Sequence, residues 1–231
     1  MTSFGPVYGG VLTDAALADP NNTHAILLRL VGRDQEVLEI GCATGYMTRV
    51  LATRQGCRVT GFEINAEAAR LAQPFLQRLI TGDLERAADL AEIAGEFDVV
   101  LIGDVLEHLA APGPALRAFR AHLRPGGRLI VSLPNVAHWS IRRALLAGRW
   151  ELTDVGLMDR THLRWYTRRT AAAMLEATGY RITLRRASYG FPAHWRLGLG
   201  PRLAAWAQAR AMLPAFDNLF AMQHIFVATP A

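Results

Sequence analysis

The chain has 231 residues, and all 25 of the residues counted as Lys+Arg are arginine, so it contains no lysine. Without a lysine ε-amine it cannot form a pyridoxal Schiff base, a lysine-dependent phosphate-binding loop or a Tyr-x-x-x-Lys dehydrogenase pair. The formal net charge of +5 conceals two unequal halves, because residues 1–115 carry a net charge of −7 and residues 116–231 a net charge of +12. The two halves therefore present fields of opposite sign to partners, although an Arg-only composition can also reflect the base composition of a genome.

Length and composition predict one globular domain. The two cysteines, Cys42 and Cys57, lack metal-binding spacing, and the first residues lack a signal-peptide pattern, so we expect a reduced, cytoplasmic protein. Apolar runs are interrupted by a proline or a charge before they reach roughly 18 residues, which argues against a membrane-spanning helix.

In chain order, apolar strand-like runs alternate with Ala/Leu/Arg stretches of helical period, the pattern of βαβ units with a parallel sheet. The predicted strands are Glu36–Ile40, Arg58–Glu63, Arg78–Ile80, Phe97–Ile102, Arg128–Leu133, Arg181–Ala187 and Ile225–Thr229. The predicted helices are Asn22–Val31, Tyr46–Arg54, Ala66–Leu71, Leu84–Ile93, Pro114–Leu123, Val136–Leu146, Thr167–Thr178 and Leu203–Met212.

These elements divide the chain into parts within one domain. Residues 1–35 are predicted to form an N-terminal helix with a flap, and residues 36–188 with 224–231 the core. The segment 189–223 is too long for an unstructured loop in a compact domain, so we expect a helical insertion near the C-terminus that covers part of the core.

The strongest motif is an apolar strand that runs directly into Gly41-x-x-x-Gly45 and then into a helix. Glycine at both positions allows a tight turn and a close approach of backbone to a ligand. Glu63 ends the second strand, where a carboxylate can bind both hydroxyls of a ribose. The pattern predicts a nucleoside-containing ligand; the alternative is an ordinary turn in a nucleotide-free fold of this type.

Two residues of this turn bear on which nucleoside binds. Ala43 replaces the middle glycine of the dinucleotide fingerprint G-x-G-x-x-G, and Glu39 lies in the strand just before the turn. A carboxylate there would repel a pyrophosphate, but it suits a cation such as the ammonium and sulfonium of S-adenosylmethionine.

With these motifs the chain resembles the class I S-adenosylmethionine-dependent methyltransferases, over about residues 22–188 and the final strand. The resemblance rests on several motifs in the right order, namely Glu39–Gly45, Glu63, Thr81–Leu84, Phe97–Leu109 and Leu123–Val131. It implies an α/β fold with a Rossmann-like seven-stranded sheet, mostly parallel with a reversed last strand, and helices on both faces.

The resemblance also implies a donor site, with Glu63 on the ribose, Asp83 and Leu84 beside the adenine, and Asp104 or its backbone near the methionyl group. The full predicted set is Glu39, Gly41, Cys42, Ala43, Thr44, Gly45, Glu63, Ile64, Asp83, Leu84, Asp104 and Val105.

Two later segments, Leu133–Trp139 and Asp159–Thr167, resemble a narrower group. They are similar to methyltransferases of bacterial secondary-metabolite, cell-surface sugar and quinone pathways, and to relatives of the methionine-biosynthesis protein W. The Asn/Asp-Pro-Pro-Tyr/Phe pattern of DNA amino-methyltransferases is absent after the fourth strand, where Gly103–Leu106 stands instead. DNA is therefore not the expected acceptor.

Two histidines are candidate catalytic bases. His108 follows the fourth strand at the edge where acceptors bind in this class, although Asp104-x-x-Glu107 can also be a helix-capping box with His108 as its neighbour. His162 lies in an irregular stretch, and loops at this edge of a sheet supply substrate groups, with a purely structural role as the alternative.

The same region also suggests a metal. Asp104, Glu107, His108 and His162 resemble the Glu-x-x-Glu-His plus distal His that binds a divalent ion in small-RNA 2′-O-methyltransferases and, in part, in quinone-pathway O-methyltransferases. Such a set would suit a cation that lowers the pKa of a hydroxyl. Because Asp replaces the first Glu, the match is incomplete, and a divalent metal is not expected.

The basic half interleaves arginines with aromatic residues, which could clamp a phosphate, a carboxylate or a stacked ring. The alternative is a solvated helix face with core aromatics. His138 and Trp139 could line the acceptor pocket. The arginines are Arg142, Arg143, Arg149, Arg160, Arg164, Arg168 and Arg169, and the aromatics are Trp139, Trp150, Trp165 and Tyr166.

The sequence thus predicts an enzyme that methylates a small, anionic biosynthetic intermediate. Oxygen is favoured over nitrogen or carbon as the acceptor atom, with His108 or His162 as base. A homodimer is possible. One alternative is an RNA 2′-O-methyltransferase with a divalent metal, and another is a non-catalytic partner of the same fold. The intact Gly41, Gly45, Glu63 and Asp83 argue against the second alternative, because a scaffold needs no nucleoside site.

Overall fold

The computed structural model describes residues 10–190, 202 and 214–231. Its strands are β1 (Glu36–Ile40), β2 (Arg58–Glu63), β3 (Arg78–Thr81), β4 (Phe97–Gly103), β5 (Leu123–Pro134), β6 (Tyr180–Tyr189) and β7 (Ala221–Pro230). Its helices are α1 (Asp14–Ala18), α2 (Thr23–Val31), α3 (Tyr46–Gln55), α4 (Ala66–Ala72), α5 (Ala87–Leu90), α6 (Pro112–Ala121), α7 (Trp139–Leu146), α8 (Arg168–Ala177) and α10 (Pro214–Phe220). Two short 3₁₀ turns, η1 (Gln73–Phe75) and η2 (Leu106–His108), follow α4 and β4.

The strands form one seven-stranded sheet in the order β3-β2-β1-β4-β5-β7-β6. Strands β1 to β5 pair in parallel, whereas β7 runs antiparallel to both of its neighbours, β5 and β6. The predicted mostly parallel sheet with a reversed last strand is therefore confirmed. Because parallel strands end on the same edge, the segments that follow β1, β2 and β4 meet at one side of the sheet.

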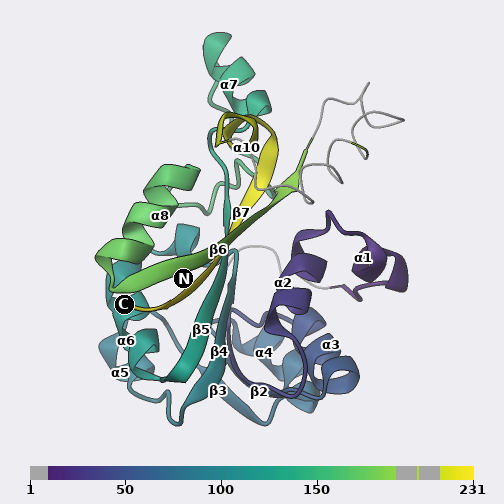
Figure 1. Cartoon of the computed structure of the whole chain (residues 1–231), viewed down its shortest axis with the longest axis vertical. Helices are drawn as coiled ribbons and strands as arrows, with labels where there is room; N and C mark the ends of the chain where they lie inside the picture. The colour runs from purple at the N-terminus through teal and green to yellow at the C-terminus, as the bar shows by residue number, and fades with distance from the viewer. Residues whose placement is uncertain (1–9, 191–201, 203–213) are drawn as a thin grey trace.

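Both faces of the sheet are buried, and the side chains of the central strands alternate between two cores. In β4, Val100 and Ile102 pack with α6 and α8 residues, whereas Val99 and Leu101 pack with α2 and α3 residues. Figure 1 shows α6 and α8 on one side of the sheet and α1, α2 and α3 on the other. The prediction of helices on both faces is confirmed.

Several predicted bounds differ from the structure. The helix expected from Val136 begins at Trp139, and the last strand begins at Ala221 instead of Ile225. Two other elements differ for reasons visible in the structure. The helix expected over Leu84–Ile93 is only α5, because the Asp83 amide donates to the Asp89 carboxylate (2.8 Å) and the Glu85 amide to the Asp83 carboxylate (2.9 Å), which hold residues 83–86 as a turn. The fifth strand begins at Leu123 instead of Arg128, with a break in its register to β4 between Phe97 and Val99. Side chain–backbone hydrogen bonds thus shorten the predicted helix, and an irregularity in the sheet accompanies the longer strand.

The predicted insertion is described only in part. The helix expected over Leu203–Met212 and residues 1–9 of the expected flap lie outside the described residues. At its edges, Tyr189 still belongs to β6, and α10 leads directly into β7, which starts at Ala221. In the part of the chain that the structure describes, no helix is long and apolar enough to cross a membrane.

Candidate functional site

The turn after β1 depends on left-handed backbone conformations. Gly41, Ala43 and Gly45 have φ angles of 70°, 48° and 79°. A Cβ on Gly41 would collide with the side chain of Val105, and one on Gly45 would lie 2.8 Å from the Ala72 Cα atom. The two predicted glycines are thus required by conformation and by space, while Ala43 adopts the left-handed region with a side chain. The close approach of Val105 joins the segment after β4 to this turn.

The carboxylate of Glu63 is fixed beside the same turn. One oxygen accepts a hydrogen bond from the Ala43 amide (2.8 Å), and the other accepts one from the Asn65 amide (2.9 Å). A carboxylate has about four lone-pair sites, so both oxygens keep capacity for further donors such as ribose hydroxyls. Glu63, at the end of β2, is therefore held beside the turn that follows β1.

Glu39 is the buried acid of the turn, with 1% of its surface exposed. One carboxylate oxygen accepts the Thr48 hydroxyl (2.7 Å), and the other has no hydrogen-bond partner. Burial raises the pKa of Glu39 to about 7, with a further contribution from the nearby Glu63. An adjacent cation would stabilise the ionised form, in line with the predicted binding of a positively charged group. Cys42, in contrast, is buried, and its sulfur packs close to Gly61.

The remaining residues of the predicted donor set flank the turn. Ile64, directly after Glu63, is an unusually exposed large apolar side chain (42%), whereas Leu84 is buried and Asp83 and Thr44 are half-buried. An exposed isoleucine next to the predicted ribose-binding residue is an apolar surface of the kind that could contact an adenine ring.

Asp104 joins the ends of three strands. Its carboxylate accepts the Ser132 hydroxyl of β5 (2.8 Å) and the Gln223 side-chain amide of β7 (3.2 Å), and its backbone has a φ of 54°. Burial raises its pKa, while the nearby His24 of α2 opposes that rise. Ser132, Gln223 and His24 were missed at the sequence level. A serine inside the apolar run of β5 was the one available signal, because a fully buried strand has little reason to carry a hydroxyl.

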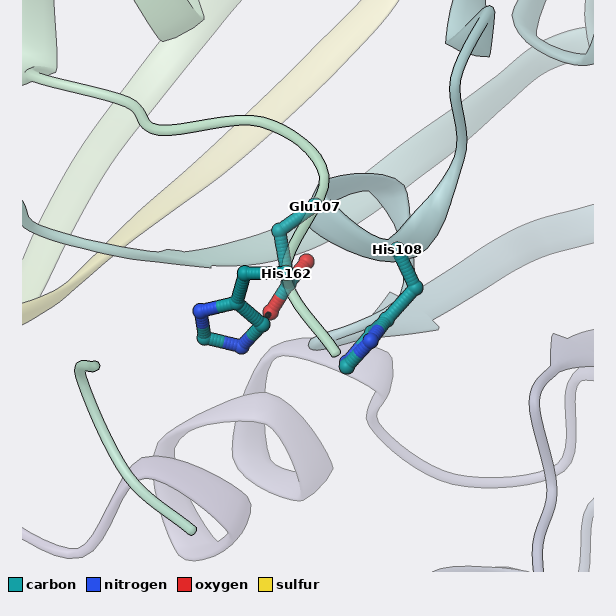
Figure 2. A group of neighbouring side chains, drawn as sticks. All are labelled: Glu107, His108 and His162. Carbon is teal, nitrogen blue, oxygen red and sulfur yellow. Dashed lines mark ion pairs between the residues drawn. The ribbon is translucent and has the colours of Figure 1, made fainter. Parts of the chain in front are cut away.

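Glu107, His108 and His162 form a second cluster, with one potential ligand atom of each side chain within 4.8 Å of the others. Figure 2 shows Glu107 and His108 on the turn after β4 and His162 on a segment that crosses in front of it. The Oε1 atom of Glu107 lies 4.0 Å from Nε2 of His162, which is too far for a hydrogen bond. Both Glu107 oxygens and Nδ1 of His162 are buried and lack a hydrogen bond of ordinary geometry.

Burial also controls the charges in this cluster. It raises the pKa of Glu107 well above its ordinary value, and the neighbouring Asp104 and Asp159 add to that rise. Burial lowers the pKa of His162 to about 4, with His108 as a second cause. At neutral pH the imidazole of His162 is therefore uncharged, so the contact between Glu107 and His162 is not an ion pair.

Backbone hydrogen bonds bring His162 to the cluster. The amides of Leu163 and Arg164 both donate to the Glu107 carbonyl (2.8 and 3.0 Å), and Nε of Arg164 donates to the Ala110 carbonyl (2.7 Å). Asp104, predicted as the fourth member of a metal-like set, lies outside the cluster because Ser132 and Gln223 hold its carboxylate.

Known proteins were compared with the chain as a whole. A family model described as a methyltransferase domain matches residues 16–184. The chain belongs to this methyltransferase family. Among curated relatives, the methyltransferase is similar to the ubiquinone biosynthesis O-methyltransferase of Albidiferax ferrireducens, at 32% identity over 123 residues, which cover 51% of this chain and 48% of the relative. The corresponding enzyme of Caulobacter sp. strain K31 is 39% identical over 103 residues, covering 43% and 40%. The methyltransferase thus matches about half the length of these relatives.

Solved structures show the same fold. Magnesium protoporphyrin IX methyltransferase from Synechocystis PCC 6803 with bound SAH has a TM-score of 0.59 at 16% identity, covering 97% of this chain and 91% of that one. The 1,6-didemethyltoxoflavin-N1-methyltransferase of Burkholderia thailandensis has a TM-score of 0.56 at 22% identity, covering 94% and 79%. The predicted class I fold and family are confirmed, with S-adenosylmethionine as the methyl donor of that class.

The cluster of the methyltransferase also fits a divalent cation. Ligand atoms around one ion at about 2.0–2.2 Å lie roughly 3–4 Å apart, close to the separation of Glu107 and His162. The buried carboxyl of Glu107 has no hydrogen-bond partner, and a bound cation would interact favourably with it. One carboxylate and two imidazoles suit a borderline metal.

Other predicted acceptor contacts of the methyltransferase have structural partners instead. Nε2 of His138 and the indole nitrogen of Trp139 both donate to the Gly190 carbonyl (2.8 and 3.0 Å), so they anchor the end of β6. Four of the seven arginines also have local partners: Arg142 binds the Ala137 carbonyl, Arg143 lies over the Trp139 ring, Arg160 pairs with Asp154, and Arg164 binds Ala110. The interpretation of these four as an anion clamp is therefore not favoured.

Proposed function

We propose that this methyltransferase moves the methyl group of S-adenosylmethionine to a hydroxyl oxygen of a small biosynthetic metabolite. The observation that carries the proposal is the cluster that Glu107 and His108, on the turn after β4, form with His162 of the segment docked against it. Val105 of the same turn approaches the donor-binding Gly41. A hydroxyl needs to lose its proton to become a strong nucleophile, and imidazoles are suited to that task near neutral pH.

On the donor side, the proposed roles of Glu63 and Glu39 rest on their contacts, and those of the other residues rest on the resemblance to the family. The Glu63 carboxylate, fixed by two amides, would accept the ribose hydroxyls, and Glu39 would face the cationic part of the donor. Ile64 and Leu84 would flank the adenine, with Asp104 near the methionyl group. These residues position the donor, and positioning supplies most of the rate of an in-line displacement.

On the acceptor side, the two histidines differ. Burial lowers the pKa of His162 to about 4, which makes it a weak base at neutral pH. His108 is therefore the preferred general base, and the buried side chains of Glu107 and His162 lie beside it. A divalent ion held by Glu107, His108 and His162 would supply a second way to lower the pKa of the acceptor hydroxyl.

Similarity supports the acceptor class. The curated relatives carry the name ubiquinone biosynthesis O-methyltransferase, which favours a small molecule over RNA as the acceptor. The net charge of +12 on the second half supports an anionic acceptor. The cytoplasmic location and the homodimer expected from the sequence stay predictions.

The test measures methyl transfer from a ¹³C-methyl donor to a panel of small phenols and hydroxy acids, and to a short RNA. We expect an O-methyl product, and we expect His108→Ala to lower the rate about 10²–10⁴-fold while calorimetry shows unchanged donor binding. His122→Ala, which changes a half-buried histidine at the end of α6 whose ring contacts the Gly95 carbonyl, is the matched control and should keep full activity.

Several outcomes would decide against parts of the proposal. An N-methyl product or a fully active His108→Ala enzyme would refute the O-transfer mechanism, and product on RNA alone would favour the ribose methyltransferase. Absence of donor binding would refute the enzyme altogether. Loss of activity on chelation, restored by a divalent salt, would assign a cation to the cluster, and indifference to chelation would remove it.

A further inference from the structure

A chain of hydrogen bonds reaches His108 from the loop that carries His162. Asp159 is buried, and one of its carboxylate oxygens accepts both the amide (2.8 Å) and the hydroxyl (2.6 Å) of Thr161. Nδ1 of His108 lies 3.1 Å from the Thr161 hydroxyl oxygen and 3.3 Å from the Thr161 carbonyl oxygen. Fifty-three positions separate His108 from Thr161, so only the folded chain creates this contact.

The directions of these hydrogen bonds determine which nitrogen of the neutral His108 imidazole carries the hydrogen. The hydroxyl of Thr161 has one hydrogen, and the short contact to a carboxylate commits it to Asp159. The hydroxyl oxygen can therefore only accept from His108, and a carbonyl oxygen accepts in every case. Nδ1 of His108 must carry a hydrogen, which leaves the lone pair of the neutral imidazole on Nε2.

We propose that Asp159 and Thr161 are positioning residues that hold His108 as the Nδ1–H tautomer, so that Nε2 takes the proton of the acceptor. The proposal deepens the proposed function and rests on it for the identity of the acceptor proton. The O–H bond of the acceptor breaks and an Nε2–H bond forms. The oxygen lone pair then bonds to the methyl carbon, and the C–S bond breaks with its electron pair passing to sulfur, which becomes a neutral thioether.

The same chain also stabilises the product of proton transfer. When His108 gains the proton, its Nδ1–H still points at Thr161, and Thr161 links it to the negative charge of Asp159. When a carboxylate orients an imidazole through an intermediate group, the imidazole keeps one tautomer. The carboxylate also stabilises the positive charge that the imidazole gains when it acts as a base. A merely structural Asp159–Thr161 turn would fold the loop without affecting the tautomer.

The experiment uses the full chain, first without donor or acceptor, and records the ¹⁵N chemical shifts of the His108 imidazole, assigned by the spectrum of His108→Gln. We expect a protonated Nδ1 and an unprotonated Nε2 in the wild type. Thr161→Val removes the hydroxyl but keeps the backbone amide bond to Asp159 and the Thr161 carbonyl. His108 Nδ1 then retains only the longer contact of 3.3 Å, so we expect the share of the Nε2–H tautomer to rise above that of the wild type. Thr161→Ser restores the hydroxyl and should restore the wild-type shifts.

Kinetics then link the tautomer to the rate. We expect Thr161→Val to lower kcat about 10- to 100-fold, the usual cost of removing such an orienting partner, with KM for the donor unchanged. Thr161→Ser should recover most of the loss. Thr153→Val makes the same chemical change at a threonine of the same segment whose hydroxyl binds the Val155 carbonyl, and it should change neither shifts nor kcat.

The failure of this proposal can be distinguished from the failure of the proposed function. An Nε2–H tautomer in the wild type, or unchanged shifts in Thr161→Val, overturns the positioning role whatever the activity is. The expected shifts together with an N-methyl product, or with no methyl transfer, would leave the tautomer intact and refute the proposed acceptor chemistry.

Discussion

At the residue scale, the site contains carboxyl groups whose charged form is disfavoured by burial. Glu39, Asp104 and Glu107 all have raised pKa values, and in each case desolvation is the largest cause. A protein that only needed to fold would gain by replacing such carboxyls with apolar groups. A cationic ligand bound at the proposed donor site or at the cluster after β4 would offset this cost.

Glu39 gives the clearest prediction of this kind. Its pKa is about 7 in the fold against an ordinary value of 4.5, so the folded state binds its proton more tightly than the unfolded state does. The stability from this group is full below pH 4.5 and is lost as the pH rises through 7. We expect the Glu39→Gln variant to gain stability relative to wild type by about 1.4 kcal/mol for each pH unit in that interval.

Urea unfolding at several pH values measures this difference. Glu96→Gln, at an exposed carboxylate, should give a difference that does not depend on pH. A constant difference for Glu39→Gln as well would show that Glu39 is ionised in the fold. Glu39→Gln should also weaken donor binding in calorimetry, because the positive charge of the donor loses its partner.

At the element scale, the site depends on how one segment docks onto another. Residues 159–166 lie against the turn after β4 through the Glu107 and Ala110 carbonyls, and Val136 donates to the Tyr166 carbonyl (2.9 Å). No helix or strand pattern in this stretch predicts such docking. Helix α3, in contrast, begins after the predicted turn at Gly45 and ends at Gly56, because both glycines take left-handed conformations.

Arg164 is the side chain that clamps this segment. Removing a charged donor from the Ala110 carbonyl costs about 1.5–3 kcal/mol, which corresponds to at least a tenfold change in an opening equilibrium. We expect Arg164→Ala to speed hydrogen exchange of the Leu163 and Arg164-position amides by that factor. Arg169→Ala, at an exposed arginine of α8, is the control and should leave these amides protected. Unchanged exchange in Arg164→Ala would mean that the two backbone bonds to Glu107 hold the segment alone.

At the scale of the whole molecule, the last strand of the sequence lies inside the sheet and not at its edge. β7 lies between β5 and β6 and contributes Phe226, 1% exposed, to the core beneath α6 and α8. One sheet therefore contains strands from the acidic half and from the basic half of the sequence. The stability of the fold cannot be assigned to either half separately. Ile225 of the same strand belongs to the core on the other face of the sheet, together with Met47 and Val50 of α3, the helix that follows the donor turn.

A substitution at Phe226 tests whether the two halves of the sequence unfold together. We expect Phe226→Ala to lower the free energy of unfolding by about 3–5 kcal/mol, the usual loss for a buried phenylalanine, in a single cooperative transition. Leu146→Ala, at a side chain that is 90% exposed, should change it by less than about 0.5 kcal/mol. A second transition for β6 and β7 in either protein would contradict the single cooperative unit.

The sequence by itself determined the donor turn, most of the elements and the family. Those features are local: Gly41, Gly45 and Glu63 belong to one βαβ unit, and their spacing follows from the geometry of a strand, a tight turn and a helix. Only the tertiary structure decided which distant groups meet. It placed His162 against Glu107, Thr161 against His108, and Ser132 with Gln223 on Asp104, while it turned His138 and Trp139 toward Gly190. Such contacts depend on backbone hydrogen bonds and packing between segments far apart in the chain, and no residue pattern records them.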